Sequence, residues 1–224
     1  MEWDFSLILH SLLPLCKALV TTIWVSLGSI LVGTILGILV GTLSLTSLKV
    51  IAFVSKTFIE IFLALPALVL LVWLYYSLPL IIPGLIIDGK NCAILGLGLS
   101  LSAFVAEIVR GGINSVPLGE IEAAYCTGMS KLQAIRYILI PQVFQKSWLP
   151  LMGQYITTYK FSTLASVIAV PEVLHTANSI IAQTYRPLEI YSLVAILFTI
   201  TIMPLNLLLR RIQKVKELGG IEII

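Results

Sequence analysis

GEIEAAYCTGMS, residues 119–130, is a polar stretch with helix start and stop signals in a chain that is otherwise strongly apolar. Pro117 suits a first helical turn, and the carboxylates of Glu120 and Glu122 follow where the helix dipole favours negative charge. Gly128 matches a helix C-terminal stop. The stretch therefore predicts a short helix in water. A membrane chain that keeps such a segment is expected to offer it to a soluble partner.

A second helix is predicted directly after the first. Ser130 and Gln133 have the spacing of a capping box, and Pro141 is expected to end the helix that they start. Ala123 and Ala124 keep the first helix slim, as docking into a groove on a partner requires. The alternative is a cytoplasmic loop that has no partner.

The composition indicates an integral membrane protein. Of the 224 residues 58% are hydrophobic and 11% are charged, and the mean hydropathy is +1.05. Soluble domains are typically about 45–50% apolar, and a helix of about 20 apolar residues crosses a bilayer. We predict an all-α membrane protein with a single domain over residues 1–224 and a long polar cytoplasmic loop at 111–147. The five predicted spans are residues 17–42, 57–82, 92–110, 148–170 and 188–209.

The orientation is predicted from lysine and arginine, because these residues gather in the cytoplasmic loops. With the N-terminus outside and the C-terminus in the cytoplasm, only Lys17, Lys90 and Arg186 face outward. Residues 5–15 are too short for a span and are expected to form an amphipathic segment on the outer surface. The cytoplasmic set is Lys49, Lys56, Arg110, Lys131, Arg136, Lys146, Arg210, Arg211, Lys214 and Lys216.

Small residues and prolines shape the first two spans. Gly33, Gly37 and Gly41 recur every four residues, which lets a neighbouring backbone approach closely. Glycine is also simply common in membrane helices, so the repeat has a plain alternative reading. Pro66 predicts a kink near the middle of the second span.

Lys160 lies near the middle of the fourth predicted span. An ionisable group there is costly in hydrocarbon and is a functional hypothesis. We expect it to face a polar cavity, with Ser162 and Thr163 as nearby hydroxyl groups. Two interpretations stay open: a contact with the substrate or a gate, and a structural ion pair.

Three further charges lie in or beside spans. Glu107 and Arg110 are three residues apart on one helix face, which favours a structural pair. Glu60 lies one turn inside the second span and is a further candidate for the substrate pathway, where it either extends to water or pairs with Lys56.

Cysteine and histidine offer no metal site. Cys16, Cys92 and Cys126 are spread along the chain without metal-ligand spacing, and His10 and His175 are isolated. A bridge between Cys16 and Cys92 is open, since both fall near outer helix ends.

Several motifs together resemble a known family. Residues 122–128 and Pro141 resemble the EAA loop of ATP-binding cassette (ABC) importer permeases, a signature of type I importers. The segments 106–113, 140–142 and 160–164 are similar to the polar amino acid branch of that family, and the likeness covers most of residues 20–210. Two departures stand out. The arginine that usually follows the acidic residue of span 2 is missing after Glu60, and Glu120 stands where the branch often has glutamine.

The resemblance implies a permease that imports a polar amino acid across a bacterial inner membrane by alternating access. It implies two cytoplasmic ATPase partners, a second permease that is either a copy or a homologue, an external binding protein, and contact with lipid but not nucleic acid. The chain lacks a GxxxxGK[ST] loop, so we predict that it is not the ATPase. It is expected to be no enzyme and to bind no cofactor. ATP and Mg are expected to bind to the partner ATPase. The residues implied in coupling are Gly119, Glu120, Glu122, Ala123, Ala124, Gly128 and Pro141.

Two other functions remain at this point. One is an ABC importer permease for methionine or another small solute, which would share the loop but not the substrate. The other is a stand-alone secondary carrier or channel. A membrane enzyme has the least support, because no nucleophile–base pair or metal-ligand spacing is present.

Overall fold

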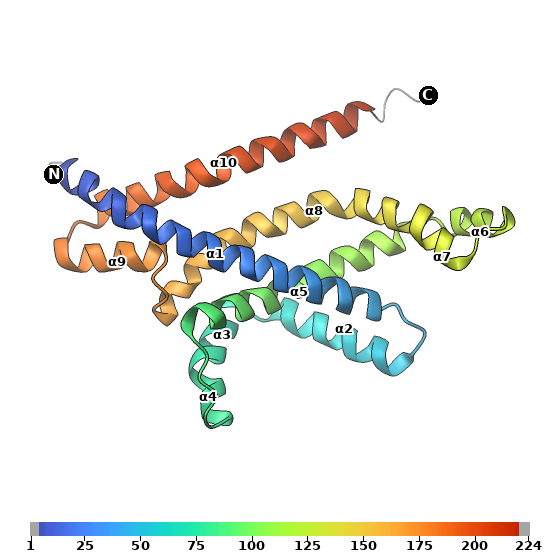
Figure 1. Cartoon of the computed structure of the whole chain (residues 1–224), viewed down its shortest axis with the longest axis horizontal. Coiled ribbons are helices and arrows are strands. Elements are labelled where there is room, and N and C mark those ends of the chain that lie inside the picture. The colour runs from blue at the N-terminus through green and yellow to red at the C-terminus, as the bar shows by residue number, and fades with distance from the viewer. Residues whose placement is uncertain (1–4, 220–224) are drawn as a thin grey trace. The chain divides into compact units, whose positions relative to one another are not determined.

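The computed structural model describes residues 5–219, with side chains described from Ser6 to Gln213. Helices and short connections make up this range, and no strand occurs in it (Figure 1), which confirms the predicted all-α class. The elements are α1 (Phe5–Leu43), α2 (Lys49–Ala64), α3 (Ala67–Val72), the π-helix η1 (Trp73–Ser77), α4 (Leu78–Ile81), α5 (Gly89–Asn114), α6 (Leu118–Cys126), α7 (Lys131–Ala134), the π-helix η2 (Ile135–Leu139), α8 (Ile140–Phe161), the 3₁₀ helix η3 (Ser162–Ile168), α9 (Val173–Thr184) and α10 (Pro187–Gly219).

Three of these helices, α1, α5 and α10, are long and apolar enough to cross a membrane by themselves. Two bent pairs can each supply one more span. The first pair, α2 with Ala67–Ile81, bends by 102°, and the second, Lys131–Ile168 with α9, bends by 48°. The predicted five spans are therefore the upper count that the described helices allow.

The first helix corrects one prediction. Residues 5–15 do not form a separate surface segment, because α1 runs without a break from Phe5 to Leu43 and contains Pro14. The reason is packing. Leu15 and Ala18, directly after the proline, are buried in a hydrophobic cluster and hold this part of the helix in place.

The two prolines that were expected to interrupt helices behave differently. Leu65, which precedes Pro66, is extended (φ −79°, ψ 124°), because a residue before proline avoids the helical region. The predicted kink is thus a full break. The prediction that Pro141 ends the second loop helix is wrong, since the helix continues through η2 and α8 to Phe161. The π-turn ahead of Pro141 changes the hydrogen-bond register where that residue has no N–H to donate.

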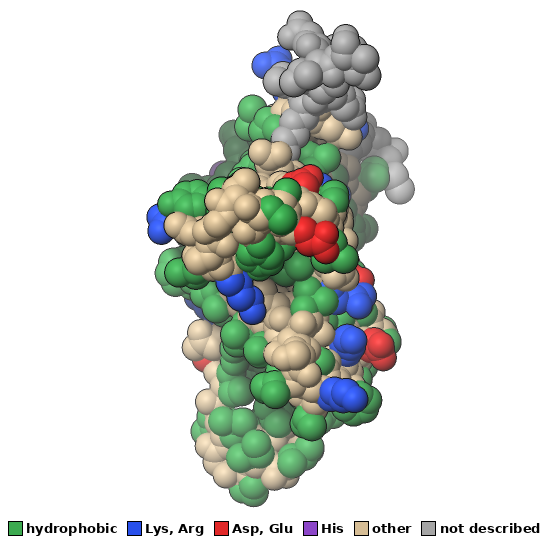
Figure 2. Space-filling model, turned by 90° about the vertical axis from the view of Figure 1, so that its right-hand side faces the viewer, with side chains coloured by type: hydrophobic (Ala, Val, Ile, Leu, Met, Phe, Trp, Pro, Cys, Tyr) green, Lys and Arg blue, Asp and Glu red, His purple; other side chains and the backbone are tan. Residues whose placement is uncertain are grey.

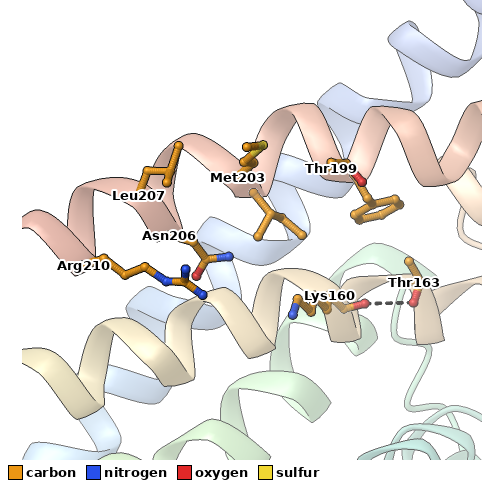
Figure 3. A pocket seen from close by; sticks show the side chains of 9 residues that line it. Lys160, Thr163, Thr199, Met203, Asn206, Leu207 and Arg210 are labelled. Carbon is orange, nitrogen blue, oxygen red and sulfur yellow. Dashed lines mark hydrogen bonds between the residues drawn. The ribbon is translucent and has the colours of Figure 1, made fainter.

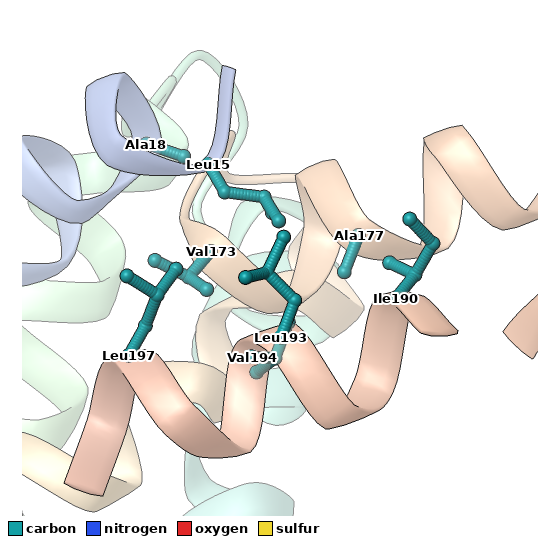
Figure 4. Close-up of a cluster of buried hydrophobic side chains, with 8 residues drawn as sticks. All are labelled: Leu15, Ala18, Val173, Ala177, Ile190, Leu193, Val194 and Leu197. Carbon is teal, nitrogen blue, oxygen red and sulfur yellow. The ribbon is translucent and has the colours of Figure 1, made fainter. Parts of the chain in front are cut away.

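The chain divides into two compact units, which we describe separately. The described parts of the first unit are residues 5–28, 71–94 and 156–219. Figure 4 shows its core, in which buried side chains from α1, α9 and α10 point toward one another. These are Leu15, Ala18, Val173, Ala177, Ile190, Leu193, Val194 and Leu197.

The second unit, residues 29–70 and 95–155, is built on close packing of α1 against α5. A Cβ atom added at Gly37 would lie 2.5 Å from Val105 Cβ, and one added at Gly41 would lie 2.8 Å from the Ala106 carbonyl oxygen. Gly33 meets the backbone of Gly98 in the same way. The predicted close approach of a neighbouring backbone to the glycine repeat is confirmed.

Candidate functional site

The helix α6 has well-defined ends. Pro117 is its N-cap, with extended backbone angles, and Gly128 follows the C-terminus with φ +85°. The Gly128 N–H donates to the Tyr125 carbonyl at 3.0 Å, and the Met129 N–H donates to the Ala124 carbonyl at 3.1 Å. This is the left-handed turn that glycine closes at helix C-termini. The predicted stop is confirmed.

The next helix starts as its sequence predicts. The Ser130 Oγ accepts from the Gln133 N–H, and the Gln133 side chain accepts from the Ser130 N–H at 2.8 Å, which is a complete capping box. Because α7, η2 and α8 continue without interruption, α6 is connected through one turn to a helix that ends at Phe161.

Side chains of α8 hold α6 and the preceding turn. The Lys146 ammonium donates to the Ser115 carbonyl at 2.7 Å, and the Gln142 amide donates to the Glu120 carboxylate. Ala124 is only 3% exposed and faces inward. The Glu120 side chain is thus engaged within the chain, whereas Glu122 is exposed.

The outward surface of α6 and α7 mixes charge with apolar groups. Figure 2 views the molecule from the end where Figure 1 draws these helices, and acidic, basic and hydrophobic side chains all appear there. Leu118 is 78% exposed and Leu132 is 76% exposed, so two apolar side chains lie among the polar groups of this segment. Leu118 and Glu122 are four residues apart and share one face of α6. We call this exposed surface, made by Leu118, Gly119, Glu122, Ala123 and Leu132, the α6 surface.

Six of the seven residues that the sequence assigned to coupling are exposed, and Ala124 is the buried exception. Leu118 and Leu132 were missed. A usable signal for both was present in the sequence: each is an apolar residue between polar residues of the predicted cytoplasmic loop, where no membrane span is expected to cover it.

Glu107 and Arg110 form an ion pair on α5. Arg110 Nη2 lies 2.7 Å from Glu107 Oε1, and Nε lies 3.0 Å from Oε2, so the contact is bidentate. Glu60 is exposed on α2, and no ion pair joins it to Lys56 in the part of the chain that is described.

A pocket of about 570 Å³ lies between the end of α8 and α10 in the first unit. Lys160 and Thr163 line it from the α8 side, and the other lining residues all belong to α10 (Figure 3). Those on α10 are Phe198, Thr199, Ile202, Met203, Asn206, Leu207 and Arg210.

Of the residues predicted for a substrate pathway, Lys160 and Thr163 share this pocket. Ser162 does not line it, because its side chain is buried and donates to the Tyr159 carbonyl at 2.8 Å. Glu60 belongs to the other unit. Sequence reasoning missed Asn206 and assigned Arg210 to the cytoplasm, one residue past the fifth predicted span. Both lie four residues apart within the apolar segment Pro187–Gln213 of α10, which was a usable signal.

The Lys160 side chain is exposed and lies in the last turn of α8. The two ion pairs found among residues 6–213 are Glu107 with Arg110 and Arg186 with Glu189. Within that range, therefore, Lys160 has no structural ion-pair partner.

Another carboxylate, that of Glu172, has a structural role as a helix cap. It is fully buried at the N-cap of α9, where its oxygens accept from the Leu174 N–H at 2.9 Å and the His175 N–H at 2.7 Å. The adjacent Val173 N–H donates to Thr22 Oγ1 at 3.2 Å and ties α9 to α1.

Among the described residues there is neither a disulfide nor a cluster that could bind a metal ion. Cys16, Cys92 and Cys126 are free, so the open possibility of a Cys16–Cys92 bridge is not realised. Over the described range, no group of three or more His, Cys, Asp or Glu could hold a metal ion.

Comparison with known proteins gives consistent matches. Residues 33–217 match the family model described as binding-protein-dependent transport system inner membrane component. The glutamine transport system permease of Escherichia coli K12 is 31% identical over 96% of this chain and 98% of its own, and the nopaline transport system permease of Agrobacterium fabrum is 34% identical over 84% and 81%. A crystal structure of an amino acid ABC transporter with histidines superposes with a TM-score of 0.88 at 28% identity, covering 96% of this chain and 99% of that one. An inward-facing methionine ABC transporter shares the fold, with a TM-score of 0.74 at 20% identity over 90% and 95%.

Proposed function

The chain belongs to the family of binding-protein-dependent transport system inner membrane components, and we propose that it is the permease subunit of an ATP-driven importer for a polar amino acid. The observation that carries this proposal is similarity over nearly the full chain to permeases named for glutamine, together with a TM-score of 0.88 to an amino acid transporter. It is a multi-pass inner membrane protein.

Cytoplasmic ATPases are the proposed partners of the α6 surface. Each of two permease subunits contacts one ATPase, which holds ATP and Mg, and an external binding protein delivers the substrate on the other side. Support comes from the exposed apolar groups Leu118 and Leu132 and from the exposed carboxylate of Glu122, which shares a face of α6 with Leu118. A partner that covers them gains apolar burial and a charge contact at once.

Transport follows from alternating access in this proposal. When the ATPases close, they push on α6, and the push reaches α8 through the capped turn at Ser130 and the contacts of Gln142 and Lys146. The same helix carries Lys160 at its other end, so movement of α8 changes the α8–α10 pocket. ATP shifts such an equilibrium only because its complex favours one of the two states.

The alternatives have weaker support. Methionine as substrate rests on a structure that is 20% identical, which bears on the fold alone. A stand-alone carrier needs no exposed surface like that of α6.

The proposed orientation has the N-terminus outside and α6 in the cytoplasm, as the distribution of lysine and arginine favours.

The test is reconstitution. The chain is co-expressed with the ATPase and binding protein encoded beside it, purified, and placed in liposomes with a mixture of labelled amino acids. We expect the ATPase to co-purify and uptake to require both ATP and the binding protein. Uptake by the permease alone would support a secondary carrier and overturn the proposal.

A further inference from the structure

We propose that the α8–α10 pocket recognises the carboxylate groups of the substrate and prefers an acidic amino acid, with two carboxylates, over neutral and cationic ones. This inference rests on the proposed function, because it names the substrate class of the same permease. It is based on the charged residues that line the pocket.

Two cations line the pocket. Lys160 comes from the end of α8 and Arg210 from α10, and both side chains extend into the space between the helices (Figure 3). None of the nine lining residues carries a carboxylate. Neither cation belongs to the ion pairs found among residues 6–213. The lining therefore contributes two positive charges that the described chain leaves unneutralised.

Unneutralised cations near a low-dielectric region favour an anionic occupant. Cations inside membrane proteins pair with anions or face a polar cavity, and charge-assisted hydrogen bonds to carboxylates are among the strong ones. A cationic amino acid would add a third positive charge. A neutral amino acid supplies one carboxylate together with its own ammonium, whereas an acidic amino acid supplies a carboxylate for each cation.

Acceptors for the substrate ammonium are present beside the cations. The Thr163 hydroxyl donates to the Lys160 carbonyl at 2.8 Å, and the Thr199 hydroxyl donates to the Ala195 carbonyl at 2.8 Å. Because each hydroxyl hydrogen is committed to the backbone, the oxygen lone pairs are left to accept. The Asn206 amide adds one more acceptor and two donors.

The size of the pocket suits a small solute. Its volume of about 570 Å³ lies within the roughly 300–1,000 Å³ usual for ligand sites. Thr199 and Arg210 lie about 16 Å apart along the helix axis at the α-helical rise. A single amino acid is shorter than this separation, so its ammonium must use an acceptor within about one turn of a cation. Thr163 is three residues from Lys160, and Asn206 is four residues from Arg210.

The experiment measures direct binding without the binding protein, so that only the pocket's selectivity is read. The purified permease–ATPase complex in detergent is titrated with L-glutamate, L-glutamine and L-arginine. We expect the Kd for L-glutamate to be at least about tenfold lower than that for L-glutamine, with L-arginine weaker still. In Lys160→Gln and Arg210→Gln, the Kd for L-glutamate should rise about tenfold or more, because each loses a hydrogen bond to a charged group. The Kd for L-glutamine should change less.

Arg211→Gln is the matched control. It removes the same charge from the next residue, which is exposed as Arg210 is but does not line the pocket. Wild-type protein that prefers L-glutamine or L-arginine, or pocket variants that behave like Arg211→Gln, would overturn the inference. An anionic lipid is the other source of a negative group. If phosphatidylglycerol abolishes L-glutamate binding at every L-glutamate concentration tested, the cations bind lipid and the inference also fails.

The proposed function is judged separately. ATP hydrolysis stimulated by the loaded binding protein is measured on the same wild-type preparation. If stimulation is present but L-glutamate is not preferred, only the assignment of substrate class is wrong. If no ATPase co-purifies and none is stimulated, the proposed function itself fails.

Discussion

The Tyr159 hydroxyl donates a hydrogen bond of 3.1 Å to Thr201 Oγ1 and so joins α8 to α10. The two residues adjoin the pocket, since Lys160 follows Tyr159 and Ile202 follows Thr201. The Tyr159 ring also lies 5.6 Å, centroid to centroid, from that of Phe198, a pocket residue. This contact lies next to the pocket and joins the two helices that carry the cations.

Tyr159→Phe should keep the ring contact and remove the hydrogen bond. Interhelical hydrogen bonds in membrane proteins average about 0.6 kcal/mol, so we expect a loss of that order in the free energy of unfolding. Thr201→Val should cost a similar amount. In a double-mutant cycle followed by thermal unfolding in detergent, the two losses should not add. Additive losses would mean that the bond contributes nothing.

Gly37→Ala should destabilise the protein, because its new Cβ would lie 2.5 Å from Val105 Cβ and 2.7 Å from the Ser102 carbonyl oxygen. Overpacking of this kind typically costs about 1–3 kcal/mol. Gly111→Ala on α5 is the control, since nothing lies within 4 Å of the added Cβ. Yield and thermal midpoint are compared for the two variants. Equal behaviour would contradict the close approach of α1 to α5.

How far the sequence predicts this structure depends on whether the deciding contact is local. The capping box at Ser130 and the stop at Gly128 need only their neighbours in sequence, and both are present. Pro141 was misjudged because a π-turn upstream accommodates it. Asn206 and Arg210 were not assigned to a site because the pocket that they line exists only when α10 packs beside the end of α8, which is far away in the sequence.

Glu122→Lys should abolish transport while membrane insertion is unaffected. The side chain is exposed on α6, so reversal of its charge leaves every span intact but opposes the partner that we propose for the α6 surface. Co-purification of the ATPase and uptake in liposomes are measured together, with Glu122→Gln as the milder comparison. Stoichiometric co-purification and normal uptake by Glu122→Lys would refute the coupling role.

The two termini should lie on opposite sides of the membrane. Reporter fusions near Trp3 and beyond Lys216, both outside the residues whose side chains are described, test the distribution of lysine and arginine on which the orientation depends. An external signal is expected for the first and a cytoplasmic one for the second. Both reporters on one side would require an even number of spans and contradict the five-span map.

Lys160→Met separates a pocket role from a structural one. If Lys160 were half of a buried ion pair, its removal would strand a carboxylate and cost about 3–5 kcal/mol. The side chain is instead exposed, and no ion pair holds it among residues 6–213. We therefore expect the free energy of unfolding to change by less than about 0.5 kcal/mol, as for other substitutions away from packed contacts.

The same variant should lose function, because Met fills the space without offering a charge to the substrate. Substrate-stimulated ATP hydrolysis by the reconstituted complex should fall sharply, while basal hydrolysis reports that the ATPases are still attached. A strongly destabilised Lys160→Met complex would restore the structural interpretation. A stable and fully active complex would exclude both roles and mean that the ammonium group reaches water without touching the substrate.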